Sequence, residues 1–272
     1  MFARHALALV TLLLAWTGAA TAQTAARDPW SRVPALPTSY YSDDGFIDRV
    51  DQAYDAAVSD IEKQAKINAE IRKSFDQMDA TQKMQRMQAY MTKNPQEAMK
   101  TMQAMQAAAT TTTGGVTAAN NVKLLEELPV YKTNFNLALD KALKPLQARQ
   151  EEIVKTRTQA ISEGEMGFKT PADAAQYAAL VQQENAEYEK ICVSYFGPKG
   201  SFTTWLASYK QDVAKNLISA GEGNDSAIVM QLAIMDTPTG GYRSTAGLEG
   251  VRDYLGKLKD VYSLRHRKKQ AK

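Results

Sequence analysis

The chain has 272 residues, of which 44% are apolar, 23% charged and 8% aromatic. This composition excludes an intrinsically disordered chain, and the single cysteine excludes a disulfide-rich miniprotein. The formal net charge of +3 is too small to indicate a nucleic-acid partner. We therefore expect a globular protein that binds no nucleic acid.

Residues 1–22 have the pattern of a secretory signal peptide. Arg4 starts a short polar segment, residues 6–16 are mainly apolar, and residues 20–22 read Ala-Thr-Ala before Gln23. The apolar stretch is shorter than the roughly 20 residues that span a bilayer. We expect cleavage before Gln23 and export to the periplasm.

The segment that follows predicts an extended strap and then a long helix. Three prolines within 23–42 favour extended backbone, and Asp43 suits a helix N-terminus. Apolar residues then recur at alternating spacings of three and four, with Gln64 and Asn68 at polar positions of the same seam. This pattern is typical of a bundle helix. The apolar seam residues are Ile47, Val50, Tyr54, Ala57, Ile61, Ile71 and Phe75.

Caps, prolines and glycines predict the helices that follow. Asp79 and Asn94 suit the N-termini of two shorter helices near 80–92 and 95–109, before a Thr-Gly run at 110–115 breaks the pattern. A long helical stretch follows from about 125 to 153, and we expect kinks or breaks at Pro129 and Pro145. The remaining helices are expected at 170–195, from a cap at Ser201 to about 221, and from about Ser244 to Tyr262.

No alternating strand pattern is present in the sequence, and helical spacing recurs along it. We therefore expect an all-α protein, an elongated helical bundle with a long antiparallel coiled-coil-like hairpin, in one domain over 43–264. The alternative is a coiled-coil stalk over 43–165 that carries a smaller helical head at 170–264.

Few residues could carry catalysis or hold a cofactor. His266 is the only histidine after residue 22, and it lies in a basic run where no rigid element would hold it beside a nucleophile. The counts of histidine and cysteine also exclude His-rich and Cys-rich metal sites. Glu184, Glu187 and Glu189 are expected to be solvated helix surface. We expect no enzyme and no cofactor.

Cys192 shares a helical stripe with Tyr188, Ile191 and Tyr195, at spacings of three and four residues. An apolar stripe of this kind predicts a buried core cysteine. The alternative is a redox or intermolecular disulfide role.

The stretch 76–110 is unusual because it contains no Leu, Ile, Val or Phe, whereas it holds seven of the eleven methionines. The candidate interaction residues are Met84, Met87, Met91, Met99, Met102 and Met105. Three interpretations stay open for them. Unbranched thioethers could fill an irregular helix interface, could form an adaptable apolar surface, or could bind a soft metal such as Cu(I) or Ag(I).

These observations predict a non-enzymatic periplasmic helical interaction protein of the chaperone or scaffold type, whose partners are proteins or unfolded clients. Its helices also offer a route to self-association. The alternative is a soft-metal binding accessory protein that uses the methionine-rich stretch 76–110, which is expected to form a helical hairpin. The basic tail at 265–272 is expected to contact an anionic envelope surface, or else to be a solvated, frayed terminus.

Overall fold

The computed structural model describes residues 28–93, 95–96, 99, 116–155, 167–222, 235, 241–265 and 267. The chain divides into two units, Met1–Val33 and Pro34–Lys272. In the first unit, Pro29–Arg32 forms the short 3-10 helix η1, and the Asp28 carboxylate accepts a hydrogen bond from the Trp30 backbone N–H at 3.1 Å. The expected extended backbone is therefore wrong for η1, because an aspartate cap followed by a proline favours a helical turn.

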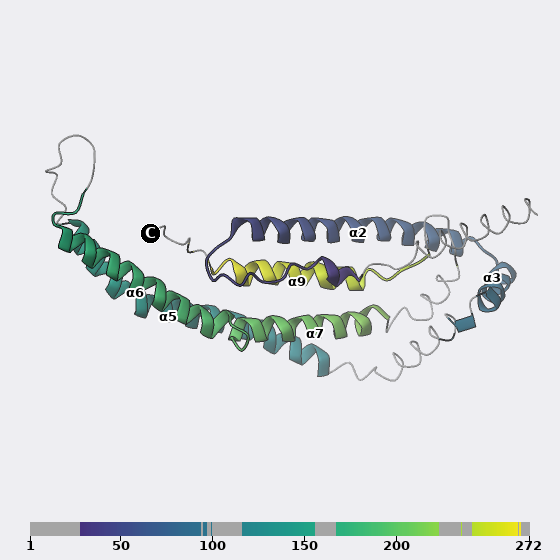
Figure 1. Ribbon diagram of the computed structural model, residues 1–272. Coiled ribbons are helices and arrows are strands. Elements are labelled where there is room, and N and C mark those ends of the chain that lie inside the picture. Colours follow the sequence, from purple (N-terminus) through teal and green to yellow (C-terminus); the bar gives the residue numbers. More distant parts are fainter. Residues whose placement is uncertain are drawn as a thin grey trace, which may run out of the picture. The chain divides into compact units, whose positions relative to one another are not determined.

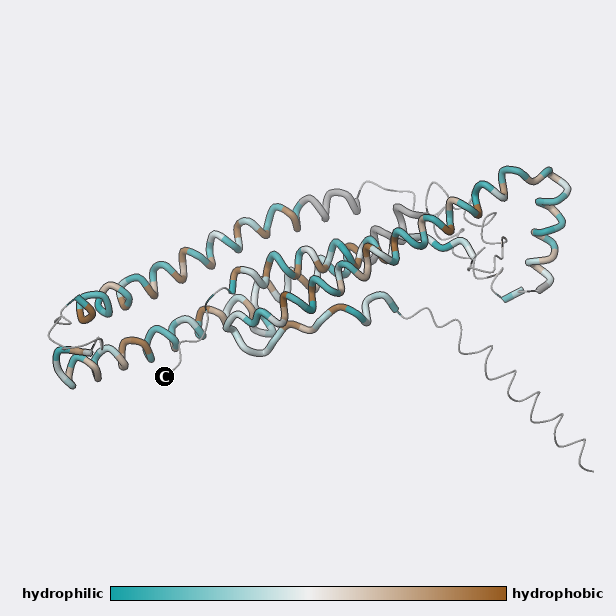
Figure 2. Tube along the Cα trace, turned by 90° about the horizontal axis from the view of Figure 1, so that it is seen from above, coloured by the Kyte–Doolittle hydropathy of each residue, from teal (hydrophilic) through white to brown (hydrophobic). Residues whose placement is uncertain are grey.

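The second unit is built from α-helices, and the described part of the chain contains no strand (Figure 1). The helices are α2 (Asp44–Asp76), α3 (Ala80–Lys93), α5 (Val116–Lys155), α6 (Pro171–Phe196), α7 (Ser201–Glu222) and α9 (Ala246–Tyr262). Hydrophobic and hydrophilic residues alternate along them in Figure 2, as expected for helices with one apolar face. The all-α prediction is confirmed. Among the described helices, none has both the length and the apolar character that a membrane crossing requires.

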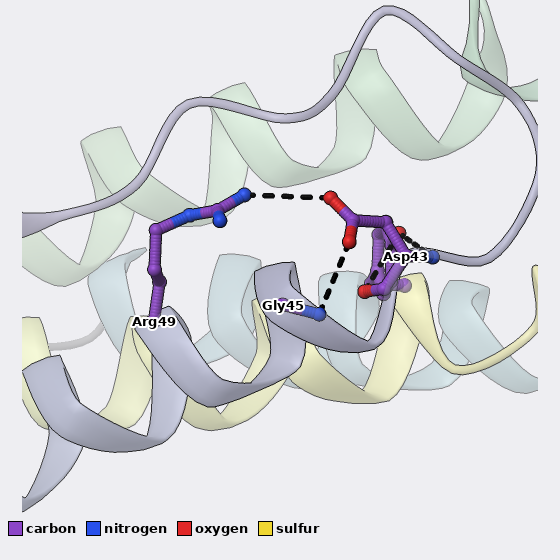
Figure 3. A network of polar contacts seen from close by, with 4 residues as sticks. Asp43, Gly45 and Arg49 are labelled. Atoms are coloured by element: carbon purple, nitrogen blue, oxygen red, sulfur yellow. Dashed lines mark hydrogen bonds and ion pairs between the residues drawn. The ribbon is translucent and has the colours of Figure 1, made fainter.

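The N-terminus of α2 is held by the Asp43 side chain, as its sequence predicts. One carboxylate oxygen accepts a hydrogen bond from the Gly45 backbone N–H at 3.0 Å, and the other lies 3.5 Å from an Arg49 guanidinium nitrogen (Figure 3). The backbone N–H of Asp43 donates to the Tyr262 hydroxyl at 2.7 Å. The cap therefore starts α2 and also attaches it to the end of α9.

Two further helices begin at reciprocal caps that were expected from the sequence. At α3, the Asp79 backbone N–H donates to the Gln82 side chain at 3.2 Å, and the Gln82 N–H donates to the Asp79 carboxylate at 2.8 Å. At α6, Thr170 and Asp173 exchange the same two bonds at 3.1 Å each. Both arrangements satisfy backbone groups that a helix start leaves unpaired.

The two prolines of α5 do not break it, which corrects the expected breaks at Pro129 and Pro145. A proline inside a helix costs about 3 kcal/mol. Buried leucines lie beside both positions, namely Leu128 next to the first and Leu143 and Leu146 around the second. Because each buried leucine contributes about 1.5–3 kcal/mol, the packing outweighs the cost of the prolines.

Helix α7 begins at Ser201, but the serine is not its cap. The Gly200 carbonyl accepts a hydrogen bond from the Thr204 backbone N–H at 2.9 Å, and the buried Ser201 hydroxyl has no hydrogen-bond partner among the described residues. A Cβ atom at position 200 would lie only 2.4 Å from the carbonyl carbon and oxygen of Tyr195. The close approach of α6 therefore requires glycine at this helix start, and the expected serine cap is wrong.

Helices α5 and α6 form an antiparallel pair (Figure 1). Near the end of α5, Ile153 packs in one buried cluster with Leu180 from the first half of α6. Eighteen residues earlier, the fully buried Phe135 ring lies 5.4 Å from the ring of Phe196, the last residue of α6. Helices α5 and α6 thus lie side by side, and the long coiled-coil-like hairpin stays a prediction.

The first half of α5 continues beyond α6 and packs against α7. The Phe202 ring lies 5.9 Å from Phe135 and 6.4 Å from Tyr131. One turn further along α7, the Trp205 indole N–H donates to the Leu124 carbonyl at 2.7 Å. With 40 residues, α5 is long enough to contact two consecutive helices, and the turn between them lies beside Phe135.

Helix α9 contacts both α2 and α7 (Figure 1). It runs antiparallel to α2, because the Phe46 ring centre lies 4.3 Å from that of Tyr262, while the Asp51 carboxylate pairs with the Lys259 ammonium at 2.6 Å. The first and last helices of the unit are therefore neighbours. This pairing corrects the stalk-and-head alternative, since the helices of the proposed stalk pack against helices of the proposed head.

The buried face of α2 is rotated slightly from the expected seam. Val50 and Ala57 are buried as expected, but Phe46 and Ala53 are buried as well, whereas Tyr54 is 37% exposed. The correction follows from α9, which lies against the face that carries Phe46 and Ala53. Ile71 and Phe75, which also belong to the expected seam, are buried.

The expected polar seam positions hold the segment that leads into α9. The Asn68 amide donates to the Arg243 carbonyl at 2.7 Å and accepts from the Arg243 backbone N–H at 3.2 Å. The Gln64 amide donates to the Asn68 side-chain oxygen at 2.8 Å. These bonds fix the register between α2 and the chain before α9.

The contact at Gly200 makes a testable prediction. We expect Gly200→Ala to lower the free energy of unfolding by about 1–3 kcal/mol, because the new methyl group forces the α6–α7 turn apart. In α9, a Cβ at Gly256 would meet nothing within 4 Å, so Gly256→Ala should stabilise the protein by about 0.5–1 kcal/mol. Urea unfolding of both variants measures the difference. A stability loss at Gly256, or none at Gly200, would contradict the described turn.

Candidate functional site

The methionine-rich region meets the end of α2 through one face of α3. Ile71 and Phe75 of α2 form a buried cluster with Met235, which is only 2% exposed. The partly buried residues packed against this cluster are Ile67, Met78, Met87, Tyr90 and Tyr242. The Lys83 ammonium also lies 4.5 Å from the centre of the Phe75 ring. Met87 is therefore partly buried against this cluster, and the three interpretations of the methionines stay predictions.

Three other methionines of the predicted surface are exposed. Met84 is 64% exposed, Met91 is 42% exposed and Met99 is 59% exposed. Met102 and Met105 lie outside the described residues. We call Met84, Met91 and Met99 the exposed methionine group, and these residues stay candidates for an interaction surface.

The helical geometry of α3 explains why neighbouring methionines differ in burial. Met84 and Met91 are seven residues apart and therefore lie on nearly the same side of the helix. Met87 and Tyr90 lie further round, on the side that contacts α2. The apolar stripe of α3 is thus wider than its contact with α2, and its outer edge remains exposed.

The soft-metal interpretation stays a prediction. Within the part of the chain that the structure describes, no group of three or more His, Cys, Asp or Glu side chains could hold a metal ion. Thioethers of the exposed methionine group are therefore the soft ligands to consider at this surface.

A second cluster, which the sequence analysis missed, surrounds Glu184 of α6. Its side chain is 3% exposed, and its carboxylate accepts hydrogen bonds at 2.8 Å from the side-chain amides of Gln147 and Gln150 on α5. An Arg267 guanidinium nitrogen lies at the same distance from Glu184 Oε1. The expectation that Glu184 is solvated surface is wrong, because these partners replace water around the carboxylate.

Residues 40–43, 262–265 and 267 lie together beside α6, and we call them the clasp. The Ser42 backbone N–H donates to the Arg267 carbonyl at 3.0 Å. The Tyr40 carbonyl accepts from the Tyr188 hydroxyl at 3.0 Å. The clasp therefore connects α6 to both the entry of α2 and the exit of α9.

Arg265 lies inside the clasp and is 1% exposed. Its Nε donates to the Tyr40 carbonyl at 3.3 Å, and its guanidinium carbon lies 4.9 Å from the Tyr262 ring centre and 5.4 Å from that of Phe196. Burial lowers the pKa of this guanidinium. Aromatic faces compensate part of the lost hydration through cation–π attraction.

These positions concern two residues of the basic tail at 265–272, and contact of that tail with an anionic surface stays a prediction. Arg265 is buried and Arg267 is bound to Glu184, so neither arginine is available to an anionic surface. His266 and residues 268–272 lie outside the described residues. The sequence signal is ambiguous here, since a run of basic residues does not show which of them has an acidic partner in the fold.

A four-residue spacing along α6 could have located the buried carboxylate. Leu180, Glu184, Tyr188 and Cys192 follow one another at intervals of four, and all four are buried. On a helix, such residues lie along one side. Reading Glu184 as part of this stripe, instead of as part of a glutamate series, would have predicted its burial.

Cys192 is fully buried, which confirms the predicted core position. Burial raises the pKa of its thiol to about 11, although the Tyr188 hydrogen bond and the positive charge of Arg265 act in the opposite direction. Burial and the hydrogen bond to Glu189 likewise raise the pKa of Tyr41 to about 12. The Cys192 thiol and the Tyr41 hydroxyl are therefore protonated at neutral pH.

The comparisons leave the family of this chain open. No family model, no curated protein and no solved structure matches the sequence or the fold.

The Glu184 cluster predicts a large stability loss when the carboxylate is removed. Glu184→Ala should lower the free energy of unfolding by about 3–5 kcal/mol, because it leaves the partly buried Arg267 cation and two amides without their acceptor. Asp51→Ala is the control, since it breaks a pair with Lys259 whose side chains are 44% and 46% exposed. This exposed pair should contribute about 1 kcal/mol or less. Equal losses in urea unfolding would contradict the buried position of Glu184.

The raised pKa of Cys192 predicts weaker stability in alkali. An unfolded thiol ionises near its ordinary pKa of 9.0, whereas the folded thiol ionises near 11. Unfolding therefore releases a proton between these values, and stability should fall as the pH rises from 9 to 11. Cys192→Ala should lose less stability over the same range, as measured by urea unfolding at each pH. An identical decline in the variant would contradict this assignment.

Proposed function

We propose that this protein is an exported, non-enzymatic interaction protein of the chaperone type, and that the exposed methionine group binds apolar segments of partner proteins. The observation that carries the proposal is the 64%, 42% and 59% exposure of Met84, Met91 and Met99. Met84 and Met91 lie on α3, whose other face packs against a buried cluster, and Met99 follows α3 in the sequence. The signal-like pattern of 1–22 supports export.

Methionine suits this role because of its flexibility. Its side chain is unbranched, has three rotatable bonds and carries a polarizable sulfur, so it adapts to partners of different shape. The neighbouring Met87 and Tyr90 attach α3 to the buried cluster of Ile71 and Phe75. This attachment allows the outer edge of α3 to be altered while the contact with α2 remains.

Helix α5 provides a matched comparison surface. Leu125, Val130 and Leu137 are 47%, 55% and 61% exposed, which is similar to the exposed methionine group. Leucine and valine are branched and less flexible than methionine. Binding that depends only on exposed apolar area should therefore involve these α5 residues as well as the exposed methionine group. The proposed binding depends on the exposed methionine group alone.

The central test replaces the exposed methionine group with serine, as Met84→Ser, Met91→Ser and Met99→Ser together. We expect the melting temperature to change little, because exposed side chains lose little packing. We expect suppression of the aggregation of a reduced, unfolding test protein to fall strongly, as measured by light scattering. The control variant carries Leu125→Ser, Val130→Ser and Leu137→Ser and should suppress aggregation as well as the unchanged protein.

Three outcomes would contradict the proposal. The unchanged protein could show no suppression, the methionine variant could suppress as well as the unchanged protein, or the α5 variant could lose suppression equally. Titration with Cu(I), followed by intact mass, tests the soft-metal alternative in the same proteins. Binding that is lost in the methionine variant alone, without any effect on aggregation, would favour the alternative function.

A further inference from the structure

We propose that Met84, Met91 and Met99 are sites of reversible oxidation by peroxide, and that their oxidation to sulfoxides switches off binding by the exposed methionine group. The modification sites follow from the exposure of the thioethers, whereas the switch rests on the proposed function. Two packed methionines, Met87 and Met235, serve as slowly reacting references within the same chain.

Exposure separates the methionines into distinct classes. The exposed methionine group is 42% to 64% exposed, while Met235 is 2% exposed and Met87 packs beside it against the same buried cluster. Thioethers react with peroxide where the reagent reaches the sulfur, so susceptibility follows exposure. A buried thioether reacts only when the structure opens locally. The three exposed sulfurs should therefore react first.

The reaction requires only a hydroperoxide as the oxidant. The thioether sulfur attacks one peroxide oxygen, a sulfur–oxygen bond forms, and the oxygen–oxygen bond breaks. With hydrogen peroxide, the thioether loses two electrons and becomes a sulfoxide, and the other oxygen leaves as water after proton transfer. The reverse reaction needs a dithiol-dependent methionine sulfoxide reductase, which returns the sulfoxide to the thioether and releases water.

The product changes the surface in a definite way. A sulfoxide is polar and is a strong hydrogen-bond acceptor. It binds water, which must be removed when an apolar partner segment covers it, so binding of that segment becomes less favourable. Met87 stays on the protected face of α3, and its contact with the cluster of Ile71 and Phe75 is kept. Oxidation is thus expected to alter the exposed methionine group without detaching α3 from α2.

The experiment treats the full chain with hydrogen peroxide and maps the added oxygen by tandem mass spectrometry over time. We expect Met84, Met91 and Met99 to react at least about tenfold faster than Met235, because the reagent reaches Met235 only through local opening. Met87 should react more slowly than Met84 and Met91. Similar rates at Met235 and at the exposed methionine group would overturn the assignment of the sites.

The switch is tested by treating the full chain with hydrogen peroxide until Met84, Met91 and Met99 carry sulfoxides while Met235 does not. Aggregation suppression should then fall strongly, with the helical circular dichroism and the melting temperature retained. A methionine sulfoxide reductase should restore suppression as it removes the added oxygen from these three residues. Suppression that persists when all three residues are oxidised, or that does not return when the oxygen is removed, would overturn the switch.

The two proposals fail in different ways. If the untreated protein does not suppress aggregation, the proposed function and the switch that rests on it are wrong, whereas the oxygen map still decides the modification sites. If suppression is present but the oxygen is spread evenly over all methionines, the modification sites are wrong and the proposed function stands.

Discussion

The Glu184 carboxylate accepts hydrogen bonds from Gln147 and Gln150 and pairs with Arg267, all at 2.8 Å, and this buried interaction links three parts of the chain. A buried charge is tolerated only when its partners are in place, so α5, α6 and the segment after α9 must meet in one register. Gln147 and Gln150 are three residues apart on α5, which lets one amide reach each oxygen. Since α9 also contacts α2, Arg267 connects the α5–α6 pair to the α2–α9 pair.

The parts of the fold that depend on neighbouring residues could be predicted from the sequence. The caps at Asp43, Asp79 and Thr170 are local, and the helices they start were predicted at the correct place. The continuity of α5 through its prolines could not be predicted, because packing from other helices decides it. The same holds for Gly200, whose requirement for glycine arises from the backbone of Tyr195.

The candidate site shows the same division between local and distant effects. Composition drew attention to 76–110, and the helical spacing predicts Met84, Met87 and Met91 on one face of a helix. The cluster against which Met87 packs includes Met235, which is 148 positions further along the chain, so no local pattern reveals the whole cluster. Glu184 was misinterpreted because its partners come from distant segments.

The clasp has a consequence for the order in which the protein folds. Tyr40 and Arg265 are separated by 225 positions, and the contact between Asp43 and Tyr262 spans 219 positions. Contacts of such long separation form late, because the intervening chain must first be brought together. While a ribosome is still making α9, the first turn of α2 lacks its partner hydroxyl and the carboxylate of Glu184 lacks its cation. A partly made chain therefore keeps this region open, and closure requires the whole sequence through Arg267.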